Sequence, residues 1–431
     1  MPRVLLACGL AWLACLGAGA LWPGDLLAWE LLAALPWGAA CALKCPARAG
    51  DVSRIFAVAV LARGVLLLAP PVLSDDVFRY LWDGRVQLAG LDPYAFAPSA
   101  RELAPLRDSY WAFINYRDLP TIYPPLAQFV FRVVASVWPT PLAFRALASA
   151  ADIASVALLV GLLRRRGTDA RVAVVLAWSP LAAVETAVGA HVDAAAITLL
   201  VAALLALERL RPLAAGVLAG LSLSVKLGAA ALVPLLAPAR RARVLVGVCI
   251  GLAPFALHLG GPIMPSLDDY ARRWRHNDSA FALLHGAARV AVGDGRREWP
   301  QPLARWATGR PSRDVYADEA AGALARVAAV AIWLALAALA VARRADPFGG
   351  GLLLTTAALL LAPVVHPWYL TWLLPLLVVV RYPPLLLLAA LAPLGYLASA
   401  AVWPRLVEYG VPALAALAPW AIGRARRALQ R

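Results

Sequence analysis

The sequence predicts an all-α, polytopic integral membrane protein built as a single membrane domain. Of its 431 residues, 62% are hydrophobic and only 15% are charged, and the mean hydropathy is +0.73. A water-soluble domain carries charge on about a quarter of its residues. The apolar residues form a series of runs separated by short arginine clusters, which predicts about 12–14 membrane helices together with helices on the extracytoplasmic surface.

The formal net charge of +15 does not indicate a nucleic-acid partner. The arginines lie in short clusters between apolar runs rather than on one patch, so they are better explained as topology determinants. The five cysteines lie in or beside apolar segments without a regular spacing. This pattern favours neither a disulfide scaffold nor a zinc site.

The N-terminal part, residues 1–73, is expected to hold three membrane helices at about 4–22, 26–43 and 53–73. The first apolar run has the composition of a signal peptide, but further spans follow at once, so we expect it to be the first helix. Lys44, Arg48 and Arg54 mark the loop after the second helix as cytoplasmic. The segment 74–122 is then extracytoplasmic.

Segment 74–122 begins with an acidic, amphipathic stretch, Ser74-Asp-Asp-Val-Phe-Arg-Tyr-Leu-Trp-Asp-Gly-Arg. Helical spacing predicts two faces, an apolar one with Val77, Phe78, Leu81, Trp82 and Val86 and a polar one with Asp76, Arg79, Asp83 and Gln87. The pattern favours a helix lying on the membrane surface. A plainer interpretation makes Ser74 an N-cap and the two aspartates mere complements of the helix dipole.

The remaining chain is expected to form a membrane core at 123–260, a second outer loop at 261–322 and C-terminal membrane helices at 323–431. The arginine clusters all fall on the cytoplasmic side only if one of the apolar segments does not cross the membrane completely. We expect that segment to be 123–138. Core spans are expected at about 172–187, 190–208, 212–225, 227–238 and 244–260, and C-terminal spans at about 323–342, 348–365, 367–380, 383–402 and 405–423.

Ionisable residues at membrane depth are costly, about 2.5–3.5 kcal/mol each on insertion scales, and each one needs a reason. Lys44 and Lys226 are the only lysines in the chain, and Lys226 lies between two apolar half-segments. It suits a phosphate-binding cation at the bottom of a cavity; the alternatives are snorkelling or pairing with a buried acid. For Asp152, two helical turns after Arg145, we expect a structural ion pair with that arginine.

Further polar groups fall at outer boundaries. For Glu185, His191 and Asp193, substrate contact and interfacial polarity are equally good explanations. His191 and Asp193 can share one site only if a helix begins there, because residues two apart point about 200° from each other around a helix. Pro367 biases His366 to an extended conformation, which would aim its imidazole into a cavity. Carboxylates and cations on one side suit transfer of a group from a lipid phosphate to an alcohol.

These motifs resemble the GT-C superfamily of glycosyltransferases, and more narrowly the bacterial polyprenyl-phosphate-mannose-dependent α-mannosyltransferases. The resemblance covers roughly residues 70–380. It is carried by the Asp75-Asp76 stretch with Gly90-Leu-Asp-Pro-Tyr behind it, by Tyr123-Pro-Pro-Leu, Gly189-Ala-His-Val-Asp and the Lys226 segment, and by Tyr270-Ala-Arg-Arg-Trp-Arg-His-Asn and His366-Pro-Trp-Tyr-Leu-Thr-Trp, in that order.

The resemblance implies an inverting enzyme of the bacterial plasma membrane, with its site on the extracytoplasmic side. It would move a sugar, most often mannose but also glucose or a pentose, from a polyprenyl-phosphate donor to a hydroxyl of a glycolipid or polysaccharide. Asp75 or Asp76 would be the general base. The donor phosphate would meet Lys226, His366, Arg273 and Arg275. Substrate contacts are expected from Arg79, Trp82, Asp83, Tyr94, Tyr123, His191, Asp193, Trp274, Asn277, Trp368 and Tyr369.

The resemblance also leads us to expect no essential metal or cofactor, a monomer, and membrane lipids as partners but no nucleic acid. The main alternative is a transporter or flippase of lipid-linked sugars, which would also bury charges and use broken helices. A transporter needs no acidic helix on one face, and the related halves common in transporters are not visible in the sequence. A catalytically silent assembly protein is the third possibility.

Overall fold

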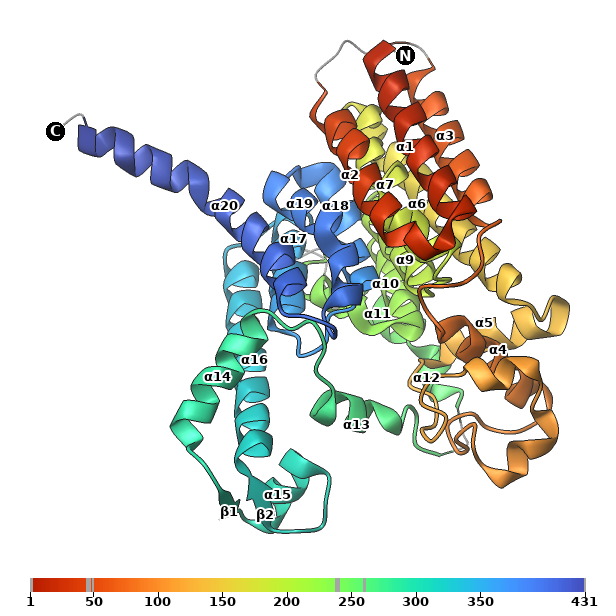
Figure 1. Ribbon diagram of the computed structural model, residues 1–431, viewed down its shortest axis with the longest axis vertical. Helices are drawn as coiled ribbons and strands as arrows, with labels where there is room; N and C mark the ends of the chain where they lie inside the picture. The colour runs from red at the N-terminus through yellow and green to blue at the C-terminus, as the bar shows by residue number, and fades with distance from the viewer. Residues whose placement is uncertain (1–2, 44–47, 49, 237–240, 259–260, 430–431) are drawn as a thin grey trace.

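The computed structural model describes residues 3–43, 48, 50–236, 241–258 and 261–429, and their side chains as far as residue 419 except that of residue 241. The described chain is helical almost throughout (Figure 1). Its two strands, β1 (Arg296–Glu298) and β2 (Asp314–Tyr316), form one short antiparallel ribbon. The all-α prediction is confirmed.

The N-terminal helices form a bundle with the middle of the chain. α1 (Arg3–Leu21), α2 (Leu26–Ala42) and α3 (Asp51–Leu66) follow the three predicted spans closely. They pack against one another and beside α6 (Pro141–Arg165), with α7 (Val174–Ala177) and α8 (Pro180–Ala187) between them (Figure 1). The elements in this bundle supply most of the large buried core.

The other elements follow in chain order. After α3 come α4 (Asp76–Leu88), η2 (Arg101–Leu106), η3 (Ser109–Phe113), α5 (Pro125–Val137), α9 (Asp193–Glu208), α10 (Pro212–Val225), α11 (Arg241–Gly251), α12 (Ala253–Ala256), α13 (Ser266–Arg273), α14 (Ala280–Val292), α15 (Gln301–Thr308), α16 (Ala317–Ala342), α17 (Gly349–Leu361), η8 (Pro367–Leu373), α18 (Leu374–Val380), α19 (Pro383–Leu391), η9 (Ala392–Leu397) and α20 (Trp403–Leu429).

Few of these helices are long enough to cross a bilayer alone. Within the described residues, α1, α6 and α16 have the length and apolar composition for a crossing, and the segment Ala170–Ala187, bent by 53°, makes a fourth. Most remaining apolar helices span 10–17 residues. Helices this short are tolerated at membrane depth when they are buried in protein or line a cavity.

The chain around Lys226 departs from the prediction. Instead of a span over 227–238, two 3₁₀ turns follow, η5 (Leu227–Ala231) and η6 (Val233–Leu235). Lys226 ends α10 with an extended backbone, φ −155° and ψ 140°. Pro234 then removes a further helical N–H donor, so no long helix can form. By contrast, α5 has only 13 residues, as expected of an incomplete piece.

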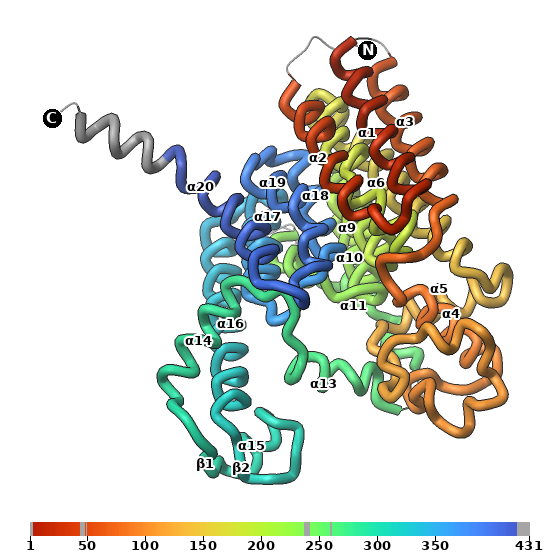
Figure 2. Tube along the Cα trace, viewed as in Figure 1, coloured from red at the N-terminus to blue at the C-terminus, as the bar shows by residue number. Residues whose placement is uncertain are grey.

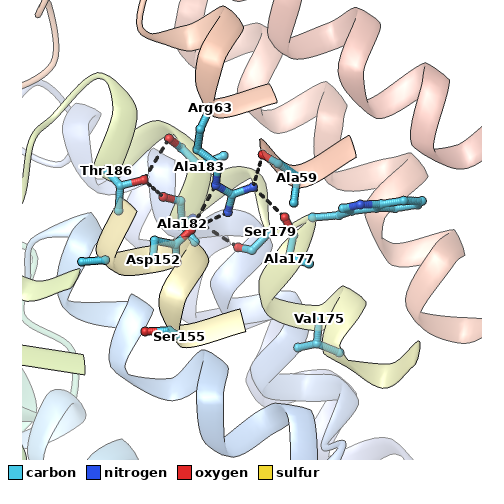
Figure 3. Close-up of polar contacts among 12 residues, drawn as sticks. Ala59, Arg63, Asp152, Ser155, Val175, Ala177, Ser179, Ala182, Ala183 and Thr186 are labelled. Carbon is cyan, nitrogen blue, oxygen red and sulfur yellow. Dashed lines mark hydrogen bonds and ion pairs between the residues drawn. The ribbon is translucent and has the colours of Figure 1, made fainter. Parts of the chain in front are cut away.

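A second correction concerns the ion pair of Asp152. Arg63 of α3, not Arg145, is its partner, with Nη2 2.6 Å from Oδ2 and Nε 3.0 Å from the same oxygen (Figure 3). Arg145 instead donates to the backbone carbonyls of Ala187 and Leu66. Sequence spacing along one helix could not reveal Arg63, because it belongs to a different helix.

Close helix packing joins α10 to α11. Gly216 and Gly220 of α10 face Gly247 and Gly251 of α11, each pair four residues apart. A Cβ at any of the four would lie 2.1–2.4 Å from a backbone carbonyl oxygen of the other helix. Small residues four apart allow membrane helices to approach this closely, and Ser224 adds a hydrogen bond to the Gly251 carbonyl at 3.0 Å.

The elements divide between two ends of the molecule. α4, α5, α12 and α13 lie at one end, and α14, α15 and the two strands extend from the same end beside the start of α16 (Figure 2). The arginine-rich turn after α6 lies at the other end, near the N-terminus (Figure 1). α16 begins at Ala317, six residues before the predicted span.

Candidate functional site

A cavity of about 880 Å³ opens at the end where α4 and α13 lie. Its walls come from segments far apart in the chain: the start of α4, the loop after η3, Lys226, α13, and the segments at His366 and Tyr396. Segments 74–122 and 261–322 therefore meet beside Lys226, where the helix α10 ends.

Two carboxylates stand at the rim of the cavity. Asp75 occupies the N-cap position of α4 and Asp76 is its first residue. The amide Nδ2 of Asn115 donates to both, 2.7 Å from Asp75 Oδ1 and 2.9 Å from Asp76 Oδ1. Burial and the neighbouring Asp76 raise the pKa of Asp75, and the hydrogen bond from Asn115 opposes that rise.

Ser74 does not take the N-cap position, although its hydroxyl accepts the backbone N–H of Asp76 at 3.3 Å. The rest of α4 is also more enclosed than a surface helix needs to be. Its polar face packs on α5, where Gln128 donates to Asp83 at 2.9 Å and Gln87 donates to Gln128 at 2.8 Å. The carboxylates are thus mounted on a helix held from both faces.

Lys226 points into the same cavity from below. Its Nζ lies 3.1 Å from Asp193 Oδ2, and it lies over the rings of Tyr123 and Tyr369 at 5.6 and 5.4 Å. Trp372 Nε1 donates to the other Asp193 oxygen at 2.8 Å. α9 begins at Asp193, which meets the condition for His191 and Asp193 to serve one site.

An aromatic column forms the back wall. The His366 ring stacks on Trp368, with centroids 4.4 Å apart and planes 1° apart. His191 stacks on Trp368 at 3.8 Å, and His276 lies against His366 at 4.9 Å. The extended backbone at His366, φ −88° and ψ 154°, agrees with the effect expected of Pro367.

The second outer loop closes the cavity with aromatic side chains. The hydroxyls of Tyr270 and Tyr369 are 2.9 Å apart, and the Trp274 ring lies 4.0 Å from that of Tyr116. Burial raises the pKa of Tyr270 well above its ordinary value, so this hydroxyl stays neutral at physiological pH.

The cavity brings together nine of the residues expected from the sequence: Asp75, Asp76, Arg79, Tyr123, Lys226, Trp274, His366, Trp368 and Tyr369. His191 and Asp193 lie directly behind its wall, in contact with Asp76 and Lys226. Their functional roles remain predictions.

The other six expected residues lie away from the cavity lining. Trp82 packs in a small core with Val86 and Leu103. Asp83 pairs with Arg79 at 2.9 Å, and the Tyr94 hydroxyl donates to the Tyr123 carbonyl at 2.6 Å.

The remaining three belong to the second outer loop. Arg273 pairs with Asp269, Arg275 with Asp278, and Asn277 donates to Glu408. These contacts support the cavity walls, and a phosphate would have to compete with Asp278 for Arg275.

Several cavity residues were missed by sequence reasoning. Asn115, Tyr116 and Tyr396 carried no motif that marked them. Tyr270 and His276 lie inside the motif at 270–277, but there only Arg273, Trp274, Arg275 and Asn277 were expected to contact substrate. Only the folded chain shows that His276 pairs its backbone with Pro363 and Val365, which sets its ring beside His366.

Among the described residues, no group of three or more His, Cys, Asp or Glu side chains could hold a metal ion. The independence from metal therefore stays a prediction. What the cavity does offer is two carboxylates, one ammonium group, imidazoles and aromatic faces. That set can remove a proton from a hydroxyl, hold an anion and stack against sugar rings.

A comparison with models of known protein families gives a match. A family model described as alpha-(1->6)-mannopyranosyltransferase, N-terminal domain, matches residues 7–242. This range includes Asp75, Asp76, Asn115, His191 and Lys226, and so covers the carboxylate rim and the floor of the cavity. No curated protein matches the chain.

Proposed function

The chain belongs to the alpha-(1->6)-mannopyranosyltransferase family, and on that premise we propose that it transfers mannose from a polyprenyl-phosphate donor, with inversion, to a hydroxyl of a glycolipid or polysaccharide. The proposed site is the cavity lined by Asp75, Asp76 and Lys226, on the extracytoplasmic side of a bacterial plasma membrane. One observation carries the proposal: the carboxylates of Asp75 and Asp76 and the ammonium group of Lys226 line the same cavity.

The carboxylate pair supports the role of general base. An alcohol becomes a competent nucleophile when a carboxylate takes its proton during attack. Asp75 and Asp76 are held by Asn115 and face the cavity at the start of α4. Inversion requires the base and the leaving group on opposite faces of the sugar.

Lys226 supports the role of leaving-group stabiliser. As the bond from the sugar C1 to the phosphate oxygen breaks, negative charge grows on the phosphate, and an ammonium group in a site shielded from water stabilises it. Asp193 and the faces of Tyr123 and Tyr369 hold the Lys226 ammonium in position. His366 contributes a second polar group on the same side of the cavity.

A second, apolar cavity supports a lipid donor. It has a volume of about 230 Å³ and shares Tyr123, Lys226, Tyr270 and Tyr369 with the larger cavity. Beyond Lys226 its walls are apolar side chains of η5, α13 and α17: Leu227, Ala231, Leu267, Ala358 and Leu359. A prenyl chain in this pocket would bring its phosphate to Lys226 and its sugar into the larger cavity.

The broken helix at Lys226 would also suit a transporter of lipid-linked sugars, which is the second candidate. Two measurements on one preparation separate the two. Purified protein is reconstituted in liposomes with radiolabelled polyprenyl-phosphate-mannose and a lipid carrying a short α-mannoside, and both transfer and movement of the donor between leaflets are followed.

We expect transfer of mannose by the wild type and its loss in Asp75→Asn, in Asp76→Asn or in both, with donor binding retained. Normal transfer in both variants would refute the base assignment. Movement of the donor across the bilayer without transfer would favour the transporter. Parallel assays with glucose and arabinose donors identify the sugar.

A further inference from the structure

His191 lies between two carboxylates: that of Asp76, which lines the large cavity, and that of Glu185, which is buried behind it. Its Nδ1 is 3.7 Å from Asp76 Oδ2, and its Nε2 is 3.2 Å from Glu185 Oε2. His191 and Glu185 are each only 1% exposed. Neither ring nitrogen has another partner in the described structure. An imidazole so placed faces a carboxylate with each of its two nitrogens.

The local sequence fixes this imidazole firmly. Ala190 has φ +61°, which turns the chain sharply between α8 and α9, and the His191 N–H donates to the Glu185 carbonyl at 3.1 Å. A Cβ on Gly189 would lie 2.7 Å from the ring carbon Cδ2 of His191, so a glycine is required there. Trp368 covers the opposite face of the ring by stacking.

Glu185 connects back to the cavity through a hydroxyl. The Tyr396 hydroxyl lies 3.1 and 2.9 Å from the two Glu185 oxygens, and Tyr396 itself lines the large cavity. Glu30 of α2 is fully buried nearby and lies within electrostatic range of Glu185. The groups in order from the rim are therefore Asp76, His191, Glu185 and Tyr396.

The titratable groups nearest to His191 come from three segments. Asp75 and Asp76 of α4 lie on one side and Glu185 of α8 on the other. His366 lies beyond Trp368, within electrostatic range of His191. A proton on the His191 ring would therefore lie between two carboxylates, those of Asp76 and Glu185.

We propose that His191 accepts from Asp76 the proton that Asp76 removes from the acceptor hydroxyl, and that Glu185 is the positioning residue that orients the imidazole and stabilises its charged form. This inference rests on the proposed transferase function, and it selects Asp76 rather than Asp75 as the base. In serine hydrolases a buried carboxylate orients the histidine that takes a proton from the nucleophile. Here Glu185 would orient His191, and His191 would take the proton from Asp76 rather than from the nucleophile itself.

The acceptor O–H bond breaks and its proton passes to Asp76 Oδ2, while the acceptor oxygen bonds to the sugar C1 and the C1–phosphate bond breaks with its electron pair going to the phosphate oxygen. Asp76 then gives the proton to Nδ1 of the neutral His191, whose Nε2 lies 3.2 Å from Glu185 Oε2. The imidazolium next returns one proton to cavity water, along Asp76 or along Glu185 and Tyr396, before another acceptor binds.

The Asp76–His191 distance of 3.7 Å is longer than a hydrogen bond. Catalytic hydrogen bonds are often long without substrate and shorten in the complex. The proposal requires the Asp76 carboxylate, whose Oδ1 accepts from Asn115, to turn its Oδ2 toward the imidazole when substrate binds.

The test compares Glu185→Gln and His191→Gln with wild type in the mannose-transfer assay. Both variants are expected to lower kcat by about 10- to 100-fold, less than the about 10²- to 10⁴-fold of a lost acid or base because Asp76 itself remains. Donor KM and donor affinity should change less than about two-fold. Thr186→Val is the matched control, because Thr186 is buried in the same helix next to Glu185 but bonds only to carbonyls of its own helix. It is expected to transfer at the wild-type rate.

A chemical rescue separates a proton carrier from a packing residue. His191→Ala is expected to regain activity as imidazole is added, in proportion to the unprotonated imidazole, whereas Glu185→Gln is not. Should His191→Ala not remain a single species on size exclusion, Glu185→Gln and a solvent isotope effect on kcat decide alone. A raised donor KM with unchanged kcat would make His191 a binding residue and overturn the proposal, and so would wild-type kcat in Glu185→Gln. Failure of the wild type to transfer mannose would refute the proposed function instead.

Discussion

The ammonium group of Lys226 lies 3.1 Å from the carboxylate of Asp193, so the cation at the floor of the cavity has a buried partner of its own. The structure is therefore compatible with both explanations of this lysine: it pairs with a buried acid, and it faces the cavity in which a phosphate would bind. Variants of the two residues together can separate these roles.

Lys226→Met should abolish donor binding and also destabilise the fold, because Asp193 is then buried without its cation. Removing one partner of a buried pair costs about 3–5 kcal/mol. The double variant Lys226→Met/Asp193→Asn should recover much of the thermal stability lost by Lys226→Met, yet still fail to bind donor. Thermal unfolding in detergent and donor binding by filtration measure the two effects. Recovery of donor binding in the double variant would show that Lys226 is structural.

Asn115→Ala should move the acid limb of the pH–rate profile to higher pH. The pKa of Asp75 is already raised by burial and by Asp76, and the hydrogen bond from Asn115 lowers it. Loss of that bond raises the pKa of Asp75 further, so the negative charge that Asp75 places beside the proposed base Asp76 is lost at a higher pH as the solution is acidified. kcat measured against pH tests this.

Asp118→Asn serves as the matched control for Asn115→Ala, since it changes an exposed residue of the same loop. Its profile should overlay that of the wild type. An acid limb that stays in place, or moves to lower pH, in Asn115→Ala would contradict the role given to this amide.

The ion pair between Arg63 and Asp152 predicts a non-additive pair of variants. Arg63→Met leaves Asp152 buried without its cation, and should lower stability by about 3–5 kcal/mol. Arg63→Met/Asp152→Leu removes both charges and should be markedly more stable than Arg63→Met alone. The arginine also donates to the Ala59 and Ala177 carbonyls, so the double variant should fall short of wild type (Figure 3). Equal stability of the single and double variants would show that the pair contributes little.

Most of the fold follows from hydrophobic patterning. Apolar runs of the right length predicted α1 and α2 to within one residue at each end, because both runs have clear polar ends, whereas α3 ends at Leu66, seven residues before the predicted end of its span. The break at Lys226 was expected, but the span predicted over 227–238 was wrong, because an apolar run does not show whether it forms an α-helix or short 3₁₀ turns. The extended backbone of Lys226 and the two turns that follow are visible only in the folded chain.

The candidate site divides in the same way. The sequence marked Asp75, Asp76 and Lys226 because they are charged residues beside or within apolar runs. It marked His366 because a proline follows it. Asn115 could not be foreseen, since its role depends on a loop that folds back over α4 from 39 residues away. Arg275 and Asn277 were also expected to contact substrate. In the folded chain they bond instead to Asp278 and Glu408, neither of which lines the cavity.

The two ends of the molecule predict a pattern of labelling across the membrane. In a cysteine-free background, a cysteine in place of Arg117 should react with an impermeant maleimide added to intact cells. A cysteine in place of Arg165 should react only after the cells are opened, since the basic turn after α6 is expected to be cytoplasmic. Both side chains are exposed in the folded chain. The reverse labelling pattern would invert the topology and place the cavity on the cytoplasmic side.

Gly220→Ala should destabilise the protein, whereas Gly64→Ala should not. A Cβ at Gly220 would lie 2.4 Å from the Val248 carbonyl oxygen, so α10 and α11 would have to separate along their whole contact. Overpacking of this kind costs about 1–3 kcal/mol. Gly64 lies in the interior of α3 with nothing within 4 Å of its added Cβ, where alanine should be neutral or gain up to about 1 kcal/mol through helix propensity. Thermal unfolding of both variants beside wild type gives the answer, and a Gly220→Ala protein as stable as Gly64→Ala would mean that the two helices are not in close contact in the membrane.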